Sequence, residues 1–173
     1  MRRIADVRNP DRSRDPDEHV WSQWRSPALM RLGPGRIAAF VTESIGPSPA
    51  RVLEVGCGSG YLALELARAG HRVTALDPDD EYVEIGRRTA HVAREAGERL
   101  DLTYHVADFH AVEREDEPYE VLVFNLSLHH IPDLPQVMRR TTSLLAPGGR
   151  VVVNDFAYDL LDARTAAWLS DLE

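Results

Sequence analysis

The chain has 173 residues, which is enough for one domain with a sizeable buried core. Its net charge of -8 argues against tight generic binding to nucleic acid, which needs a concentrated positive surface. No apolar stretch approaches the roughly 18 residues that a membrane span requires, so we expect no membrane partner. Cys57 is the only cysteine, which excludes an internal disulfide, and the first residues lack the apolar core of a signal peptide. We therefore expect a cytoplasmic protein.

Residues 1–27 are expected to form a flexible tail, because their first part is rich in Arg, Asp and Pro and has little to bury. The end of this segment carries Trp21 and Trp24, which either pack on the domain or form a lid over a ligand. We expect a single domain over residues 28–173.

Short apolar stretches alternate with longer amphipathic segments through the rest of the chain. The apolar stretches predict strands over residues 51–55, 72–76, 102–106, 119–124 and 150–154. The amphipathic segments predict helices between Gly33 and Gly46 and over residues 60–69, 80–96, 134–145 and 159–172. This alternation predicts an α/β fold, a Rossmann-like doubly wound parallel sheet with helices on both faces.

The first predicted strand runs directly into a glycine-rich loop at residues 56–60, with the sequence GCGSG. Glycines let the backbone turn sharply and let a ligand approach without Cβ clashes. Asp77 closes the second strand 19 residues after Gly58, a distance typical of an acid that accepts hydrogen bonds from a ribose. Both features belong at the carboxyl ends of parallel strands, so together they predict a nucleoside site.

The spacing of the glycines distinguishes between nucleoside cofactors. A dinucleotide-binding loop has the pattern G-x-G-x-x-G, whereas this loop has G-x-G-x-G and places Tyr61 at the last position of that pattern. Glu54 precedes the loop by two residues, and its carboxylate would repel a pyrophosphate but suits a cofactor with an ammonium and a sulfonium. The pattern therefore favours S-adenosylmethionine over NAD.

Five segments, in order, resemble the sequence motifs of the class I S-adenosylmethionine-dependent methyltransferases. They are VLEVGCGSG at 52–60, ALDP at 75–78, ADF at 107–109, VLVFNLSLHHI at 121–131 and LLAPGGR at 144–150. The LHHIPD run and the PGG turn resemble the branches that act on small metabolites, quinone-like rings or natural products. The resemblance implies an enzyme that transfers a methyl group from S-adenosylmethionine to a small-molecule acceptor by in-line displacement.

The same resemblance implies roles for the matching residues. The glycine loop would pass under the methionyl part and the ribose, and Glu54 would help to hold the methionyl ammonium. Asp77 would bind the ribose diol, Pro78 would pack beside the adenine, and the turn at Asp108 and Phe109 would bind the adenine. With the end of the fourth strand, which would lie near the methionyl group, the candidates are Glu54, Gly56, Cys57, Gly58, Gly60, Asp77, Pro78, Asp108, Phe109 and Asn125.

Several of these candidates also have simpler explanations. The glycines could serve turn geometry alone, Asp77 could cap the helix over 80–96, and Asp108 could be an ordinary turn residue. Cys57 is best explained as a small residue that fits a tight turn. We expect no metal site, because no pattern of Cys and His residues has metal-ligand spacing.

His129 and His130 are candidates for a general base that deprotonates the acceptor. Adjacent histidines point in different directions, and this family often carries His here without a catalytic role, so the catalytic residue stays open. Two other functions also stay open: a non-catalytic module that binds S-adenosylmethionine and regulates a partner, and a nicotinamide oxidoreductase. The motif of base-amino methyltransferases, Asn/Asp-Pro-Pro-Tyr/Phe, does not follow the fourth strand, which argues against a nucleic-acid substrate.

The family's sheet has seven strands, the last two forming a hairpin beside the fifth, whereas we find five strands in this sequence. We therefore predict that strands six and seven are missing and that the domain is incomplete at its C-terminal end. The fifth strand, with valines at 151–153, would then be an unprotected apolar edge that allows self-association.

Overall fold

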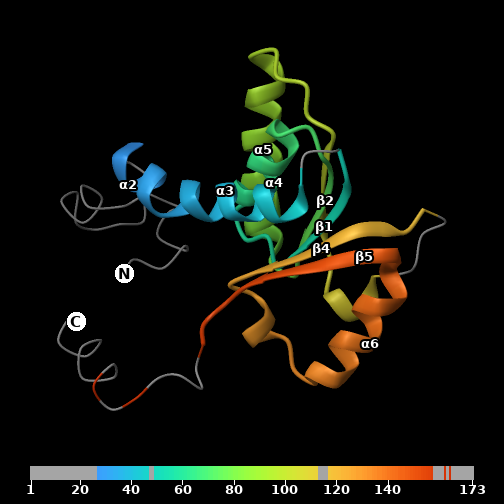
Figure 1. Ribbon diagram of the computed structural model, residues 1–173. Helices are drawn as coiled ribbons and strands as arrows, with labels where there is room; N and C mark the ends of the chain where they lie inside the picture. The colour runs from blue at the N-terminus through green and yellow to red at the C-terminus, as the bar shows by residue number, and fades with distance from the viewer. Residues whose placement is uncertain (1–26, 47–48, 113–116, 158–161, 163, 165–173) are drawn as a thin grey trace.

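The computed structural model describes residues 27–46, 49–112, 117–157, 162 and 164. Residues 1–26 of the predicted tail and almost all of the predicted final helix lie outside these residues. The predicted end of the tail at Pro27 is wrong, because Pro27 is the first residue of a helix. Within the described residues, a five-stranded parallel sheet is flanked by helices on both faces (Figure 1). The predicted α/β fold class is therefore confirmed.

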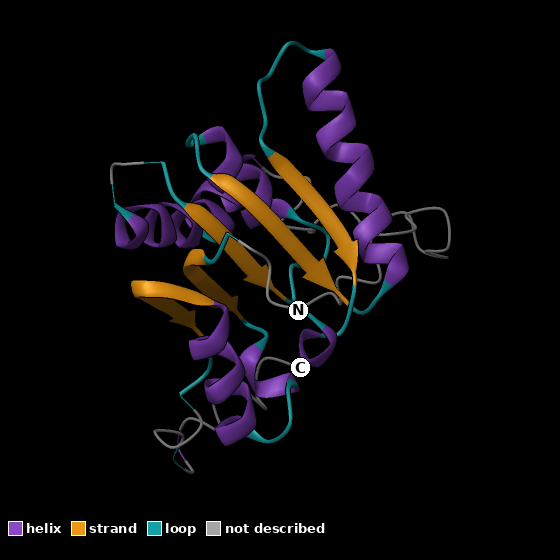
Figure 2. Ribbon diagram, turned by 90° about the vertical axis from the view of Figure 1, so that its right-hand side faces the viewer, coloured by secondary structure: helices purple, strands orange, loops and turns teal. Residues whose placement is uncertain are grey.

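The strands lie in the order β3-β2-β1-β4-β5, and every pair of neighbours is parallel (Figure 2). Their bounds are β1 Arg51–Val55, β2 Arg72–Asp77, β3 Leu102–Val106, β4 Tyr119–Asn125 and β5 Leu145–Asn154. The chain begins at the centre of the sheet with β1, continues outward to β3, and then crosses to β4 on the other side of β1. Ligands of open parallel sheets bind at the carboxyl ends beside such a reversal, here between β1 and β4.

Helices cover both faces of this sheet. Their bounds are α2 Pro27–Leu32, α3 Pro34–Ile45, α4 Tyr61–Arg68, α5 Asp80–Glu95 and α6 Leu134–Leu144, with the short 3-10 helices η4 Phe109–Ala111 and η5 Leu128–His130. The helices α3, α4 and α5 pack on one face, and α6 packs on the other (Figure 1). None of the described helices combines the length and the apolar character needed to cross a membrane.

The core has two layers because successive side chains of a strand point to opposite faces of the sheet. In β1, Val52 packs in the cluster beneath α3, α4 and α5, whereas Leu53 and Val55 pack in the cluster beneath α6. All three side chains are buried. Burial on both faces explains why the strands have near-continuous apolar sequences.

The prediction was wrong about the start of the fifth strand. β5 begins at Leu145, and residues 146–149 belong to the strand instead of forming a separate turn. Tyr119 pairs with Leu145 and Val121 with Arg150, so an irregularity in the register between β4 and β5 absorbs the extra residues. The Pro-Gly-Gly sequence signals a turn, but pairing with β4 keeps this stretch in the sheet.

Candidate functional site

A cavity of about 350 Å³ lies at the carboxyl ends of β1, β2 and β4. That volume falls in the range of small-molecule sites, roughly 300–1,000 Å³. Its lining residues are Val55, Gly56, Gly58, Leu76, Asp77, Pro78, Tyr82, Asp108, Phe109, Leu126, Ser127, His130, Ile131 and Pro132. Six of the ten predicted cofactor-binding residues are in this set, which makes the cavity the candidate site.

The glycine loop forms one wall of the cavity with its backbone. Gly56 has a φ of 72°, and a Cβ at this position would lie 2.5 Å from the Cβ of Ser127. The amides of Gly56 and Cys57 both donate to the carbonyl oxygen of Leu76, at 2.8 and 2.9 Å. Gly58 also has a positive φ, of 51°. The loop therefore needs glycine for its geometry and also exposes backbone to the cavity.

Asp77, at the end of β2, joins the glycine loop to the next helix. Its Oδ2 accepts a hydrogen bond from the amide of Gly58 at 2.8 Å, and its Oδ1 accepts one from the amide of Asp79 at 2.9 Å. The possibility that Asp77 caps this helix is wrong, because Asp79 is the N-cap of α5 and accepts from the amides of Glu81 and Tyr82. An ionised carboxylate has about four acceptor positions, so two remain for a ligand.

The turn after β3 forms the opposite wall. Asp108 caps η4, because its Oδ1 accepts from the amide of His110 at 2.7 Å, so it is a turn residue that also lines the cavity. Phe109 is buried, and its ring meets that of Phe124 edge to face at 5.5 Å. Arg140 on α6 donates to the carbonyl oxygen of Phe109 at 2.8 Å. Contacts from Phe124 on β4 and from Arg140 on α6 therefore both hold this turn in position.

Four predicted cofactor-binding residues do not line the cavity, namely Glu54, Cys57, Gly60 and Asn125. Glu54 is only 1% exposed, and its Oε2 has no hydrogen-bond partner among the described residues. The pKa of Glu54 is raised to about 8. Burial is the main cause and the negative charge of Asp77 contributes, while a backbone hydrogen bond from Ala63 acts in the opposite direction. Contact between Glu54 and a cationic ligand stays a prediction.

Cys57 is part of the glycine loop, and its side chain is buried. Burial raises the pKa of its thiol well above the usual range, and the charges of Glu54 and Asp77 raise it further. The thiol therefore stays protonated at neutral pH, whereas a nucleophilic cysteine must be a thiolate. This electrostatic setting favours the structural explanation of Cys57.

Gly60 and Asn125 take part in contacts within the protein. The hydroxyl of Tyr104 donates to the carbonyl oxygen of Gly60 at 2.9 Å, and a Cβ on Gly60 would lie 2.5 Å from that hydroxyl. Asn125 accepts a hydrogen bond from the side-chain amide of Asn154 at 2.7 Å, which links the ends of β4 and β5. Both residues therefore have structural roles beside the cavity.

The two candidate histidines differ in position. His130 lines the cavity, whereas His129 does not. The Nδ1 of His129 lies 2.7 Å from a carboxylate oxygen of Asp155, and the two histidine rings are 3.9 Å apart between centroids. In the part of the chain that the structure describes, no group of three or more His, Cys, Asp or Glu residues could hold a metal ion.

Sequence reasoning missed several lining residues. Tyr82 lies in the first turn of α5, and its position after the capping Asp79 is a signal that could have identified it. Ser127, in the loop after β4, is buried and donates to the carbonyl oxygen of Val55 at the end of β1 at 2.6 Å, a long-range contact that the sequence does not predict. Leu126 also lines the cavity, and its φ of 53° is uncommon for leucine and could not be predicted from the sequence.

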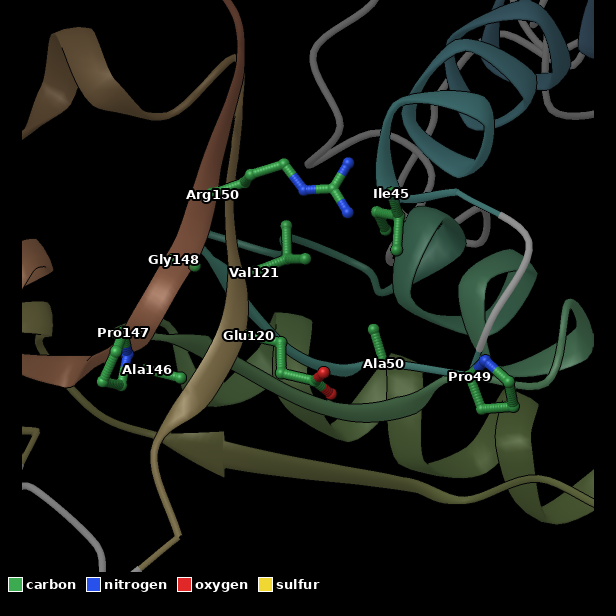
Figure 3. Close-up of a pocket in the computed structure, with 10 residues that line it drawn as sticks. Ile45, Pro49, Ala50, Glu120, Val121, Ala146, Pro147, Gly148 and Arg150 are labelled. Atoms are coloured by element: carbon green, nitrogen blue, oxygen red, sulfur yellow. The ribbon is translucent and has the colours of Figure 1, made fainter.

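A second cavity, of about 190 Å³, lies at the opposite end of the sheet (Figure 3). Glu120, near the start of β4, and Arg150, in the middle of β5, line it together with the end of α3. Arg150 donates to the carbonyl oxygen of Ser44 at 3.2 Å, and Glu120 accepts from the amide of Arg51 at 2.9 Å. These charged groups therefore tie elements together at the end of the sheet where ligands are not expected.

The chain is similar to known proteins both in sequence and in fold. A family model described as "Methyltransferase domain" matches residues 21–173. The chain is 33% identical over 141 residues to a ubiquinone biosynthesis O-methyltransferase of Yersinia pestis (strain Pestoides F), covering 82% of this chain and 54% of that protein. The chain belongs to this methyltransferase family, as the sequence motifs predicted. It spans about half the length of the curated relatives it matches.

Solved structures with the same fold include a methyltransferase of Thiobacillus denitrificans in complex with S-adenosyl-L-homocysteine. It has a TM-score of 0.63 and 20% identity, covering 99% of this chain and 62% of that one. The 4+2 cyclase SpnF also has a TM-score of 0.63, with 25% identity over 72% of this chain and 45% of its own. These matches confirm the predicted fold. Because one of them is named as a cyclase, the fold alone does not fix the reaction.

Proposed function

We propose that this domain binds S-adenosylmethionine in the cavity at the carboxyl ends of β1 and β2 and transfers its methyl group to a small molecule. The observation that carries the proposal is the buried carboxylate of Asp77, held beside the exposed backbone of the glycine loop. The two acceptor positions left on Asp77 fit the two hydroxyls of a ribose. Gly56 has no Cβ, so the sugar can approach the loop closely.

The other walls suit the remaining parts of the cofactor. Asp108 and Phe109 would bind the adenine, and Pro78 and Tyr82 also line the cavity. When bound, S-adenosylmethionine supplies a methyl group that its positively charged sulfur makes electrophilic. The chain's own task is to orient the acceptor and to exclude water from the reacting atoms. Ile131, with the neighbouring residues after β4, forms the part of the lining left for the acceptor.

The name of the Yersinia relative supports a small-molecule acceptor, since it is an O-methyltransferase of ubiquinone biosynthesis. A non-catalytic module would keep the cofactor cavity without turnover, and membership of a methyltransferase family does not favour it. A nicotinamide oxidoreductase needs a pyrophosphate site that the glycine spacing does not provide. The acidic composition argues against a nucleic-acid acceptor.

Two further proposals concern the setting of the domain. We place it in the cytoplasm, because a single buried thiol suits a reducing compartment. We also propose that, where strands six and seven are missing, copies associate through β5, which pairs only with β4 among the described strands and exposes 46% of Val153. Sedimentation should then show a dimer that disappears in Val153→Lys, and a monomer at high concentration would contradict the second proposal.

The function is tested by ligand-dependent stability. A ligand at about 100 times its Kd stabilises the folded protein by roughly 2.7 kcal/mol. We therefore expect S-adenosylhomocysteine to raise the Tm by several degrees, and NAD at the same concentration to leave it unchanged. A panel of small acceptors with isotopically labelled cofactor then measures transfer. Stabilisation by NAD but not by S-adenosylhomocysteine would contradict the proposal, and binding without transfer to any acceptor would favour the non-catalytic module.

A further inference from the structure

The loops after β4 and β5 meet at the acceptor end of the cavity because these two strands are parallel neighbours. The amide of Leu126 donates to the carbonyl oxygen of Asn154 at 2.7 Å, and the side chain of Asn154 donates to that of Asn125, also at 2.7 Å. The next residue of the β5 loop, Asp155, therefore lies beside η5, which carries both histidines.

Asp155 holds His129 at two points. One carboxylate oxygen lies 2.7 Å from Nδ1 of His129, and the other accepts from the backbone amide of His129 at 3.2 Å. The side chains of Asp155 and His129 are 11% and 21% exposed, so water weakens these contacts little. Partial burial alone would raise the pKa of Asp155, but hydrogen bonds from the amide of Phe156 and from His129 outweigh it and lower the pKa. Asp155 is therefore a carboxylate at neutral pH.

His129 in turn packs against His130. Their ring centroids are 3.9 Å apart, and the ring of Phe156 meets His129 edge to face at 5.4 Å. The amide of His130 donates to the carbonyl oxygen of Ser127 at 3.1 Å, which fixes its backbone. The side chain of Asp155 therefore contacts His129, the ring of His129 contacts that of His130, and His130 lines the cavity.

We propose that His130 is the proton acceptor for a hydroxyl group on an aromatic ring, with Asp155 and His129 as its positioning residues. This inference rests on the proposed function and names its acceptor class. The hydroxyl proton passes to a ring nitrogen of His130 while the hydroxyl oxygen bonds to the methyl carbon. The sulfur–methyl bond breaks and its electron pair stays on sulfur, which leaves a methyl ether, S-adenosylhomocysteine and a protonated imidazole.

The chemistry of the loop selects this acceptor class. A neutral amine already has a free electron pair and needs no base, whereas a hydroxyl group must lose its proton. A ring hydroxyl has a pKa of about 10, as in Tyr, which brings it within reach of an imidazole base, unlike an aliphatic alcohol. The surroundings are apolar, since Leu126 and Ile131 line the cavity and Phe156 is 57% exposed nearby. An aromatic ring fits this surface better than a charged metabolite does.

The positioning part of the proposal can be tested without any acceptor. Nitrogen NMR of the protein saturated with S-adenosylhomocysteine shows which ring nitrogen of His129 carries the proton, with His129→Gln assigning the signals. We expect the proton on Nδ1, facing Asp155, and we expect Asp155→Ala to redistribute it between both nitrogens. Signals that are the same with and without the Asp155 carboxylate would overturn the positioning role.

The catalytic part is tested with two ring hydroxyls of different acidity. Catechol is protonated at neutral pH, whereas nitrocatechol is largely ionised and needs no base. We expect His130→Gln to lower kcat on catechol by at least about a hundredfold and Asp155→Ala by about tenfold, with much smaller losses on nitrocatechol. The affinity of Asp155→Ala for S-adenosylhomocysteine should stay within about twofold, because Asp155 does not line the cavity. Asp101→Ala, an exposed aspartate before β3, is the matched control and should change nothing.

The outcomes separate this inference from the function on which it rests. Equal losses on both hydroxyls would show that His130 is not a base. Absence of transfer to catechol, with or without transfer to aniline, would overturn the acceptor class while the cofactor still binds. Failure to bind S-adenosylhomocysteine at all would remove the proposed function itself.

Discussion

The loops after β1 and β2 differ from the loops after β4 and β5 in what holds them in place. In the first pair, backbone amides make the contacts: Gly56 and Cys57 donate to Leu76, and Gly58 donates to Asp77. In the second pair, one backbone bond from Leu126 to Asn154 is joined by contacts between side chains, through Asp155 and the two asparagines at the strand ends. A backbone-built site varies little with side-chain replacement, which suits a constant cofactor. A site built from side chains can be altered one residue at a time, which suits a varied acceptor.

Backbone strain is distributed in the same way. The positive φ angles of the first pair of loops fall on glycines, whereas Leu126 and Asp133 carry φ angles of 53° and 56° in the loop after β4. Glycine adopts such angles without a steric penalty, while a leucine in this region costs roughly 1–2 kcal/mol. The loop after β4 therefore keeps a conformation that its own residues do not favour, as is common near functional sites.

The largest effect is expected at Gly56, where a side chain would collide with the other pair of loops. Gly56→Ala places a Cβ 2.5 Å from that of Ser127 at a φ of 72°. Overpacking and strain together should lower the free energy of unfolding by about 4 kcal/mol. Urea unfolding measures this, with Gly58→Ala as the control, since its Cβ would meet no atom within 4 Å. Equal losses in the two variants would show that strain alone is responsible.

The next effect concerns the buried carboxyl of Glu54. Its pKa is about 8 in the folded protein against 4.5 as the ordinary value, so between these values the folded state holds a proton that the unfolded state has lost. Folding stability from this group is therefore lost as the pH rises from about 5 to about 8. Glu54→Gln should remove the dependence and gain on the order of 3 kcal/mol relative to wild type over that interval. Urea unfolding at both pH values tests this, and a constant difference between the two proteins would contradict it.

A smaller effect is expected on ligand affinity at Asp77. Asp77→Ala removes hydrogen bonds to a charged acceptor, each worth about 1.5–3 kcal/mol, so affinity for S-adenosylhomocysteine should fall by at least roughly tenfold. Calorimetry measures the affinity, and Asp79→Ala serves as the control because that residue caps α5 without lining the cavity. Unchanged affinity in folded Asp77→Ala would contradict the ribose assignment.

The smallest effect is expected at the hydrogen bond that joins the two pairs of loops. Ser127→Ala removes the donor to the carbonyl oxygen of Val55 and should lower the free energy of unfolding by about 1 kcal/mol. Thermal unfolding measures this change. The matched control is Ser143→Ala, whose exposed hydroxyl bonds only within α6 and should cost little. A larger loss of unfolding free energy in Ser143→Ala than in Ser127→Ala would show that the Ser127 hydrogen bond contributes little to joining the loops.

The cofactor side was predictable from the sequence because its signals are local. The glycine spacing and the distance from Gly58 to Asp77 follow from the geometry of one strand, one loop and the next strand. The loops after β4 and β5 were less predictable, because Asp155 and His129 are 26 residues apart in the sequence. Only the pairing of β4 with β5 brings them together. The extent of β5 was mispredicted for the same reason, since partner strands outweigh a local turn signal. Glu54 was predicted at the site but does not line the cavity. This outcome depended on which face of β1 its side chain occupies.

The bonds that Asp77 makes to two backbone amides have a consequence for nucleoside choice. They occupy half of the carboxylate's acceptor capacity and leave room for two incoming protons. A deoxynucleoside offers only one, which would leave an acceptor position on the buried Asp77 carboxylate unsatisfied. On the proposed ribose assignment, the same two amides that shape the turn would therefore make Asp77 discriminate against deoxyribose.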